Sequence, residues 1–177
     1  MVVLIVVIVI ILLVILSKYN KLVKQKNSVK QAQSGIDVYL NQRFDLIPNL
    51  VECVKGYAKH EEQVLEKITQ LRAKYSKSKD LKEAEKLNNG INQIIAVAEQ
   101  YPELKASEQF LNLQKSLSKM ESQLQAARRI YNNEVTAYNT TINTVPTNII
   151  AKMFNFKEAE LFTIEDYKKE NIQVDLG

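Results

Sequence analysis

The chain has 177 residues, of which 46% are hydrophobic and 25% charged, and its formal net charge is +4. It contains only four Gly and three Pro, too few for the frequent turns of a β-sandwich or β-barrel, and this composition predicts an all-helical protein. A single Cys and a single His exclude, within these residues, an internal disulfide, a Cys-based zinc site and any site that needs several His side chains.

The most unusual segment is an uninterrupted run of Val, Ile and Leu at residues 2–16. As a helix it would span about 22 Å. It is shorter than the roughly 20 residues typical of a membrane-spanning helix, and Met1, Lys18 and Tyr19 can extend it to the interface. A buried core helix would carry a polar face, and a signal peptide would have basic residues before the run and a small-residue cleavage site after it. We therefore predict an uncleaved anchor over residues 1–17 and a single-pass protein of the cell membrane.

Charge around the anchor predicts its orientation. No Lys or Arg precedes the run, whereas six basic residues and only one acidic residue, Asp37, lie between residues 18 and 43. Because positively charged flanks remain in the cytoplasm, the N-terminus is expected outside and the rest of the chain inside. Residues 44–177 are nearly neutral, which disfavours nucleic acid as a partner. The six basic residues are Lys18, Lys21, Lys24, Lys26, Lys30 and Arg43.

After the anchor, apolar residues recur at helical spacing in four segments of the region 18–145. The fourth is the clearest, with a heptad-like stripe in which Leu117 and Leu124 are expected to be buried. The segments cover residues 17–44, 47–75, 81–98 and 110–142.

Helix breakers between these segments favour chain reversal. Pro48, a polar loop at residues 76–80 and Pro102 separate them. We predict an all-α fold in which the N-terminal transmembrane helix continues into an antiparallel four-helix bundle. An extended coiled-coil dimer is the competing architecture.

The tail at residues 146–177 is expected to form a short helix near Thr147–Met153 followed by irregular chain. If the four helices alternate in direction, the fourth ends near Asn143 at the membrane end of the bundle. The apolar residues of the tail, interleaved with lysines, then either contact the interface between headgroups and acyl chains or plug the open end of the bundle. Membrane-surface contacts are predicted for Lys18, Tyr19, Lys21, Lys24, Lys26, Phe154 and Phe156.

The most distinctive local sequence is found at residues 43–51. Pro48 cannot donate to a helical ladder, and Asp45 stands three residues before it. We expect a helix corner in which Asp45 caps the next helix, Pro48 lies in its first turn and Arg43 pairs with a carboxylate. A recognition site on an exposed corner is the alternative.

No catalytic, cofactor-binding or metal-binding residue is predicted. A lone Cys53 is more typical of a small buried residue than of a nucleophile. His60 lies seven residues further on, roughly 10 Å along a helix, which is too far for it to act as a base for the thiol. Because bundles that bind two irons need Glu-x-x-His on two helices, His60 is expected on a solvated polar face.

Several blocks of sequence carry a resemblance to a known family. SKYNKLV (17–23) follows the anchor, and RFDLIPNLV (43–51), VKGYAKHE (54–61), AARRIYN (126–132) with Tyr138-Asn139, and PTNIIAKMFNF (146–156) come after it. In these blocks the chain resembles the LemA family of bacterial membrane proteins, over nearly its whole length. The resemblance implies a single-pass protein with a short outer N-terminus and a cytoplasmic four-helix bundle, and it implies no enzymatic activity.

The leading functional hypothesis is a non-enzymatic scaffold or adaptor for other envelope proteins. The alternative is a membrane-surface module that senses or shapes lipid through its basic juxtamembrane segment. The expected partners are the lipid bilayer and one or more unidentified proteins. A homo-oligomer remains open, and no cofactor or nucleic acid is expected.

Overall fold

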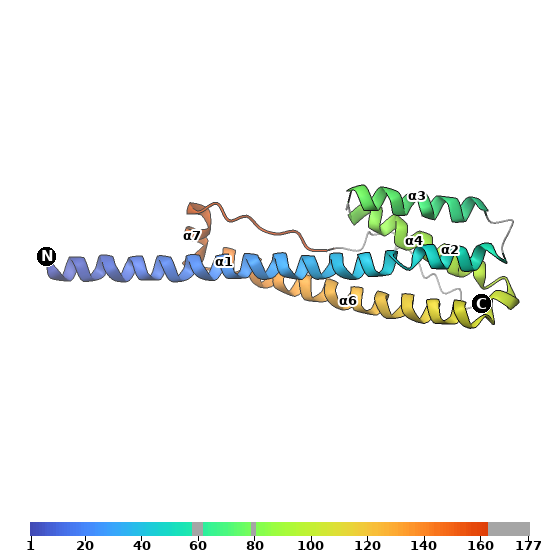
Figure 1. Ribbon diagram of the computed structural model, residues 1–177. Helices are drawn as coiled ribbons and strands as arrows, with labels where there is room; N and C mark the ends of the chain where they lie inside the picture. Colours follow the sequence, from blue (N-terminus) through green and yellow to red (C-terminus); the bar gives the residue numbers. More distant parts are fainter. Residues whose placement is uncertain (58–61, 79–80, 163–177) are drawn as a thin grey trace, which may run out of the picture. The chain divides into compact units, whose positions relative to one another are not determined.

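The computed structural model describes residues 1–57, 62–78 and 81–162, and for 81–82 the backbone alone. Within these ranges every regular element is a helix (Figure 1). This confirms the all-helical fold with a long N-terminal apolar helix, whereas the antiparallel four-helix bundle stays a prediction. The helices are α1 (Val2–Phe44), α2 (Ile47–Lys55), α3 (Glu62–Ser78), α4 (Leu81–Ala98), α5 (Pro102–Lys105), α6 (Glu108–Asn143) and α7 (Thr147–Met153).

The chain divides into two compact units. The terminal unit comprises Met1–Gln33 and Ala127–Gly177, and the central unit comprises Ser34–Ala126. The predicted division at residues 17/18 and 145/146 into anchor, bundle and tail is a different kind of boundary, drawn from composition, and stays a prediction.

In the central unit α3 packs against α4, and α2 contacts both. The predicted single helix over residues 47–75 is wrong, because α2 ends at Lys55 and α3 begins at Glu62. Gly56 occupies the position that closes α2, and glycine is a poor residue for continuing a helix. The break escaped prediction because the apolar spacing continues across it at Val54 and Tyr57.

The corner between α1 and α2 is partly as predicted. Arg43 pairs with a carboxylate, that of Glu121 on α6, and Pro48 lies in the first turn of α2. The prediction that Asp45 caps α2 is wrong, because the N-cap residue is Leu46 and makes no side-chain cap bond. Proline at the start of a helix lacks only an N–H that would be unpaired there anyway, and the N–H of Leu46 bonds to the carbonyl of Arg43 at 3.2 Å. The Oδ1 atom of Asp45 instead lies 3.6 Å from the Nη2 atom of Arg72.

The stripe along α6 is buried as expected. Leu117 and Leu124 are both at most 1% exposed, and α7 occupies the residues predicted for a short helix. In the terminal unit the stripe packs with α1 and α7, and this packing positions the candidate membrane-interface site. That core cluster contains Leu22 and Val29 of α1, Val135, Tyr138 and Ile142 of α6, and Ile150 and Ala151 of α7.

Candidate membrane-interface site

The apolar run of α1 has no protein cover. From Val2 to Leu16 all side chains except Ile15 are exposed, from 43% at Val14 to 77% at Val3. Among the described helices it alone is long and apolar enough to cross a membrane. Leaving so much apolar surface in water is unfavourable, so the exposed run is consistent with a membrane anchor. Protein contacts begin at Ile15, which packs on the terminal core cluster where the run ends.

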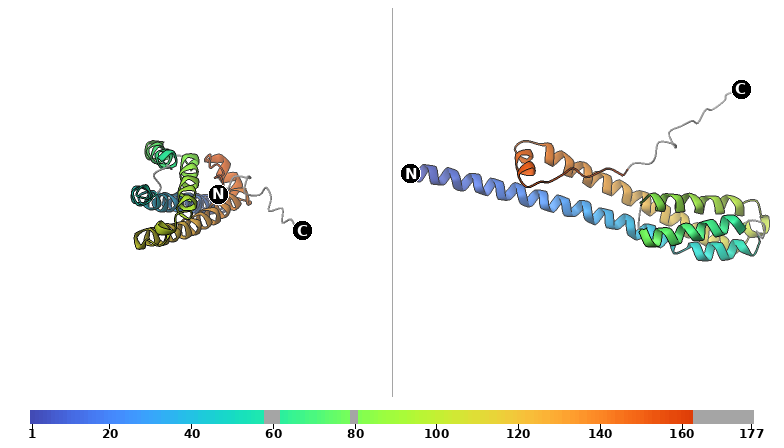
Figure 2. Two further views of the ribbon diagram at one scale, coloured as in Figure 1. Left: turned by 90° about the vertical axis from the view of Figure 1, so that its right-hand side faces the viewer. Right: turned by 90° about the horizontal axis from the view of Figure 1, so that it is seen from above.

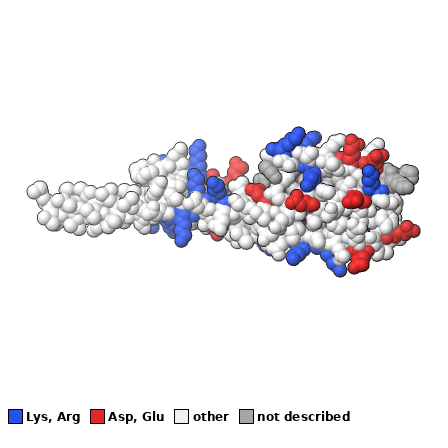
Figure 3. All heavy atoms as spheres, viewed as in Figure 1, with Lys and Arg blue, Asp and Glu red and all other residues white. Residues whose placement is uncertain are grey.

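Lysines surround α1 immediately after the run, and Figure 3 shows this basic band next to the uncharged helix. At about 100° per residue, Lys18, Lys21, Lys24 and Lys26 point to different sides of the helix. Lys18 is partly buried and the other three are exposed. A charged band around an apolar helix is typical of the level of lipid headgroups.

Three aromatic rings gather beside this band. Tyr19 lies 4.8 Å from Phe154 and 5.8 Å from Phe156, measured between ring centroids. Lys26 Nζ lies 5.8 Å from the centroid of the Phe156 ring. Phe156 is partly buried against the core cluster, whereas Phe154 is 46% exposed. The structure thus brings together four of the seven residues predicted to contact the membrane surface, and the contact itself stays a prediction.

The backbone conformation at the end of α7 sets the positions of the Phe154 and Phe156 rings. Asn155 has a positive φ of 55°, a conformation that asparagine tolerates better than most residues. The N–H of Phe156 bonds to the carbonyl of Ala151 at 2.9 Å, and the N–H of Asn155 bonds to that of Lys152 at 3.2 Å. This is a Schellman ending with asparagine at C′. After this ending Phe156 packs against the core cluster, to which Ile150 and Ala151 of α7 belong.

Beyond this turn the tail runs back along α6 in the terminal unit (Figure 2). The Oδ1 atom of Asn139 accepts from the N–H of Ala159 at 2.9 Å, and its Nδ2 donates to the carbonyl of Ala159 at 2.8 Å. Asn132 makes the same two bonds to Phe162, at 2.8 and 2.9 Å. Each amide therefore bonds both the N–H and the C=O of one residue, as a residue of a neighbouring antiparallel β-strand would.

Two tyrosines complete this arrangement. The hydroxyl of Tyr138 donates to the carbonyl of Lys157 at 3.1 Å, and that of Tyr131 donates to Glu160 at 2.9 Å. Burial raises the pKa of both hydroxyls, and the charge of Glu160 adds to the effect on the pKa of Tyr131. Both groups therefore stay protonated as donors. We call Tyr131, Asn132, Tyr138 and Asn139 the Tyr–Asn ladder.

The Tyr–Asn ladder fits the tail because the distance between its residue pairs along α6 matches the distance between the bound residues along the extended tail. Its Tyr–Asn pairs are seven residues apart on α6, about 10.5 Å along the axis. The tail residues they hold are three apart, about 10 Å in extended chain. Sequence reasoning missed this role, although the repeated Tyr-Asn pair at heptad spacing was visible. Phe162 also contacts Arg128 of α6, whose guanidinium lies 4.5 Å from the ring centroid of Phe162.

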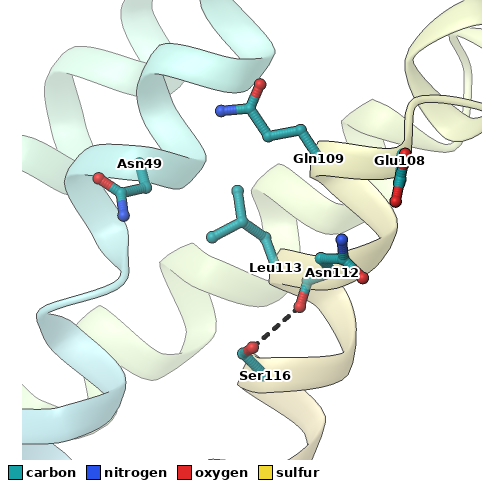
Figure 4. A pocket seen from close by; sticks show the side chains of 6 residues that line it. All are labelled: Asn49, Glu108, Gln109, Asn112, Leu113 and Ser116. Atoms are coloured by element: carbon teal, nitrogen blue, oxygen red, sulfur yellow. Dashed lines mark hydrogen bonds between the residues drawn. The ribbon is translucent and has the colours of Figure 1, made fainter.

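The central unit offers no comparable chemistry among its described residues. Cys53 is buried as expected, and burial raises the pKa of its thiol, so the nucleophilic thiolate is disfavoured. A pocket of about 490 Å³ lies between α2 and the start of α6. Figure 4 shows its lining, in which three of the six side chains are amides and Ser116 donates to the carbonyl of Asn112 at 2.9 Å. The pocket is lined by Asn49, Glu108, Gln109, Asn112, Leu113 and Ser116.

No group of His, Cys, Asp and Glu suited to a metal ion occurs in the part of the chain that the structure describes. His60, expected on a solvated polar face, lies outside that part, as does the tail from residue 163 onward. The exposed corner at residues 43–51 keeps its alternative interpretation as a recognition site only as a prediction.

The chain is similar in sequence to one known protein family and to several individual bacterial proteins. The sequence profile of the LemA family matches residues 32–176. Protein LemA of Metamycoplasma hominis is 28% identical, in an alignment that covers 89% of this chain and 74% of that protein. Magnetosome protein MamQ 2 of Paramagnetospirillum magneticum is 25% identical, and magnetosome protein MamQ of Magnetospirillum gryphiswaldense 22%. Those alignments cover 84% of this chain but only 65% of each magnetosome protein, so the chain spans about two thirds of their length.

Proposed function

The chain belongs to the LemA family, and from this premise we propose that it is a single-pass, membrane-anchored helical scaffold or adaptor for other envelope proteins. The observation that carries the proposal is the contrast within α1. Residues 2–16 are apolar and, apart from Ile15, exposed, whereas Leu22, Val29, Ile36 and Leu40 of the same helix are buried in protein. The continuous helix α1 therefore connects an apolar segment suited to a bilayer with the folded part of the chain.

The proposed topology places the folded body in the cytoplasm and the N-terminus outside. It is supported by the basic residues that follow the run, of which four surround α1 at the point where protein packing starts. Lysines at this density are retained on the cytoplasmic side. The body, residues 18–145, is proposed to be an antiparallel four-helix bundle, an arrangement favoured by the mutual packing of α2, α3 and α4.

The scaffold role is supported by the Tyr–Asn ladder. The hydrogen bonds of its Tyr and Asn side chains all go to backbone atoms of an extended peptide. Backbone recognition of extended chain is a recurring way in which proteins bind partner segments. Here the chain's own tail occupies the surface. No catalytic step is part of the proposal.

Photo-crosslinking in cells tests the proposal on the full chain. A photoreactive amino acid replaces Lys119 or Ser122, both exposed on α6, and a third probe at Val9 of the anchor serves as the control for membrane insertion. We expect both α6 probes to capture the same discrete envelope proteins and the Val9 probe to capture lipid. Capture of lipid alone from all three positions would contradict the scaffold role and favour the membrane-surface module.

A further inference from the structure

We propose that α7 is a second membrane contact, a short helix whose outer face inserts Ile149, Met153 and Phe154 into the headgroup region of an anionic bilayer beside the anchor. The proposal rests on the proposed membrane insertion of α1. The α7 contact goes beyond that insertion, because it assigns a lipid-binding surface to a helix far from the anchor in sequence.

The first argument is the division of α7 into two faces. Thr147, Ile150 and Ala151 are buried, the latter two in the core cluster with α1 and α6. On the other side Ile149 is 64% and Met153 60% exposed, and Phe154 follows them. Apolar side chains at i and i+4 lie on the same side of a helix. A short helix that is apolar on both faces needs a second apolar environment.

The second argument is the level at which α7 lies along α1. Ile15, at the end of the apolar run, packs on the same cluster as Ile150 and Ala151 of α7. Tyr19 lies three residues beyond Leu16, about 4.5 Å along the axis, and its ring contacts Phe154. A bilayer that covers residues 2–16 therefore reaches its boundary beside α7, where aromatic side chains are favoured.

The third argument is charge. Residues 17–30 of α1 contain five lysines and no acidic residue, and α7 contains Lys152 and no acidic residue. The acidic groups described in the terminal unit lie elsewhere, on α6 at Glu134 and along the tail, where Glu158 accepts a hydrogen bond from Asn143. Basic side chains around an exposed apolar face are the features that bind helices to the surface of anionic membranes. A lipid surface therefore fits this face better than an apolar protein groove does.

The absence of Trp from the sequence makes a direct test possible. Full-length Ile149→Trp protein is placed in nanodiscs of phosphatidylcholine and phosphatidylglycerol that contain a lipid spin-labelled near its headgroup. The introduced indole is the only one in the protein and reports its own environment, so insertion predicts a blue-shifted emission and strong quenching. We expect both effects to weaken in nanodiscs of phosphatidylcholine alone.

Ile130→Trp is the matched control. Ile130 is 57% exposed on α6 in the same unit, and it lies twelve residues before Ile142, about 18 Å away along the helix. We expect quenching of the Ile149→Trp protein to exceed that of the Ile130→Trp protein several-fold. Unchanged circular dichroism and melting temperature in both variants verify that neither substitution disturbs the fold.

A third variant, Val9→Trp, is placed in nanodiscs whose lipid carries the spin label deep in its acyl chain, and it separates failure of this proposal from failure of the anchor. Quenching of Val9→Trp without quenching of Ile149→Trp overturns the α7 contact and leaves the anchor, and the exposed face would then await a protein partner. Quenching of Ile149→Trp without quenching of Val9→Trp supports the contact and overturns the anchor. If neither is quenched, both proposals are overturned.

Discussion

At the scale of single residues, the amide of Asn139 makes two hydrogen bonds to the backbone of Ala159. Each neutral bond contributes about 0.5–1.5 kcal/mol, so Asn139→Ala is expected to ease local opening of the tail by about 1–3 kcal/mol. The amide hydrogen of Ala159 should exchange with solvent about 5- to 150-fold faster, as measured by hydrogen exchange. Asn133→Ala, at an exposed neighbouring position on α6, is the control and should leave that rate unchanged.

The tyrosines of the ladder predict a response to alkaline pH. Burial raises the pKa of Tyr131 and Tyr138 in the folded protein. Their contribution to stability is therefore complete below the ordinary tyrosine pKa of about 10 and is lost as pH rises through the folded values. The melting temperature should fall more steeply above about pH 10 than that of the Tyr131→Phe, Tyr138→Phe double variant. Parallel profiles would mean that the hydroxyls do not stabilise the tail.

At the scale of elements, α6 depends on its buried stripe. Leu117 is 1% exposed, and truncation of a buried Leu removes transfer free energy and leaves a cavity. Leu117→Ala is therefore expected to lower the free energy of unfolding by about 2–5 kcal/mol, as measured by urea unfolding in mild detergent. Leu111→Ala on the same helix, where Leu111 is 39% exposed, should cost far less. Equal effects of the two variants would contradict the buried position of the stripe.

The single glycine of α1 offers a stabilising change. A Cβ atom built at Gly35 has no neighbour within 4 Å, so alanine fits without displacing any group. Gly35→Ala should stabilise the protein by about 0.5–1 kcal/mol, because glycine loses more conformational freedom when it enters a helix. Gly35→Pro should destabilise it by about 3 kcal/mol or more. Urea unfolding of both variants measures these changes, and destabilisation by alanine would show that Gly35 is required for packing.

The elements differ in how far the sequence predicted them. The apolar run and the α6 stripe were predictable, because uninterrupted or regularly spaced apolar residues reflect burial or lipid exposure directly. The break after Lys55 was not, because Gly56 stands between apolar residues that keep helical spacing. The path of residues 157–162 depends on polar side chains that bind backbone, which leave no hydropathy pattern. The role of Asn155 was equally hidden, since it follows from one backbone conformation.

At the scale of the whole molecule, α1 and α6 each contribute residues to both compact units. The proposed anchor therefore belongs to the same continuous helix as buried residues of the central unit, such as Ile36 and Leu40. A form that begins after Phe44 would lack these side chains and part of the terminal core cluster. A soluble form intended to fold should begin near Ser17, after the apolar run and before Leu22.

The topology of the whole chain can be tested with one added thiol. Ser122→Cys places it at an exposed position of α6. The parent protein is the control, because Cys53 is buried with a raised pKa and should react slowly. If the lysines after the anchor keep the body inside, a membrane-impermeant maleimide will label the Ser122→Cys protein only in permeabilised cells. Labelling of intact cells would instead place the body outside, and the positive-inside argument would then fail for this chain although its anchor remained in the membrane.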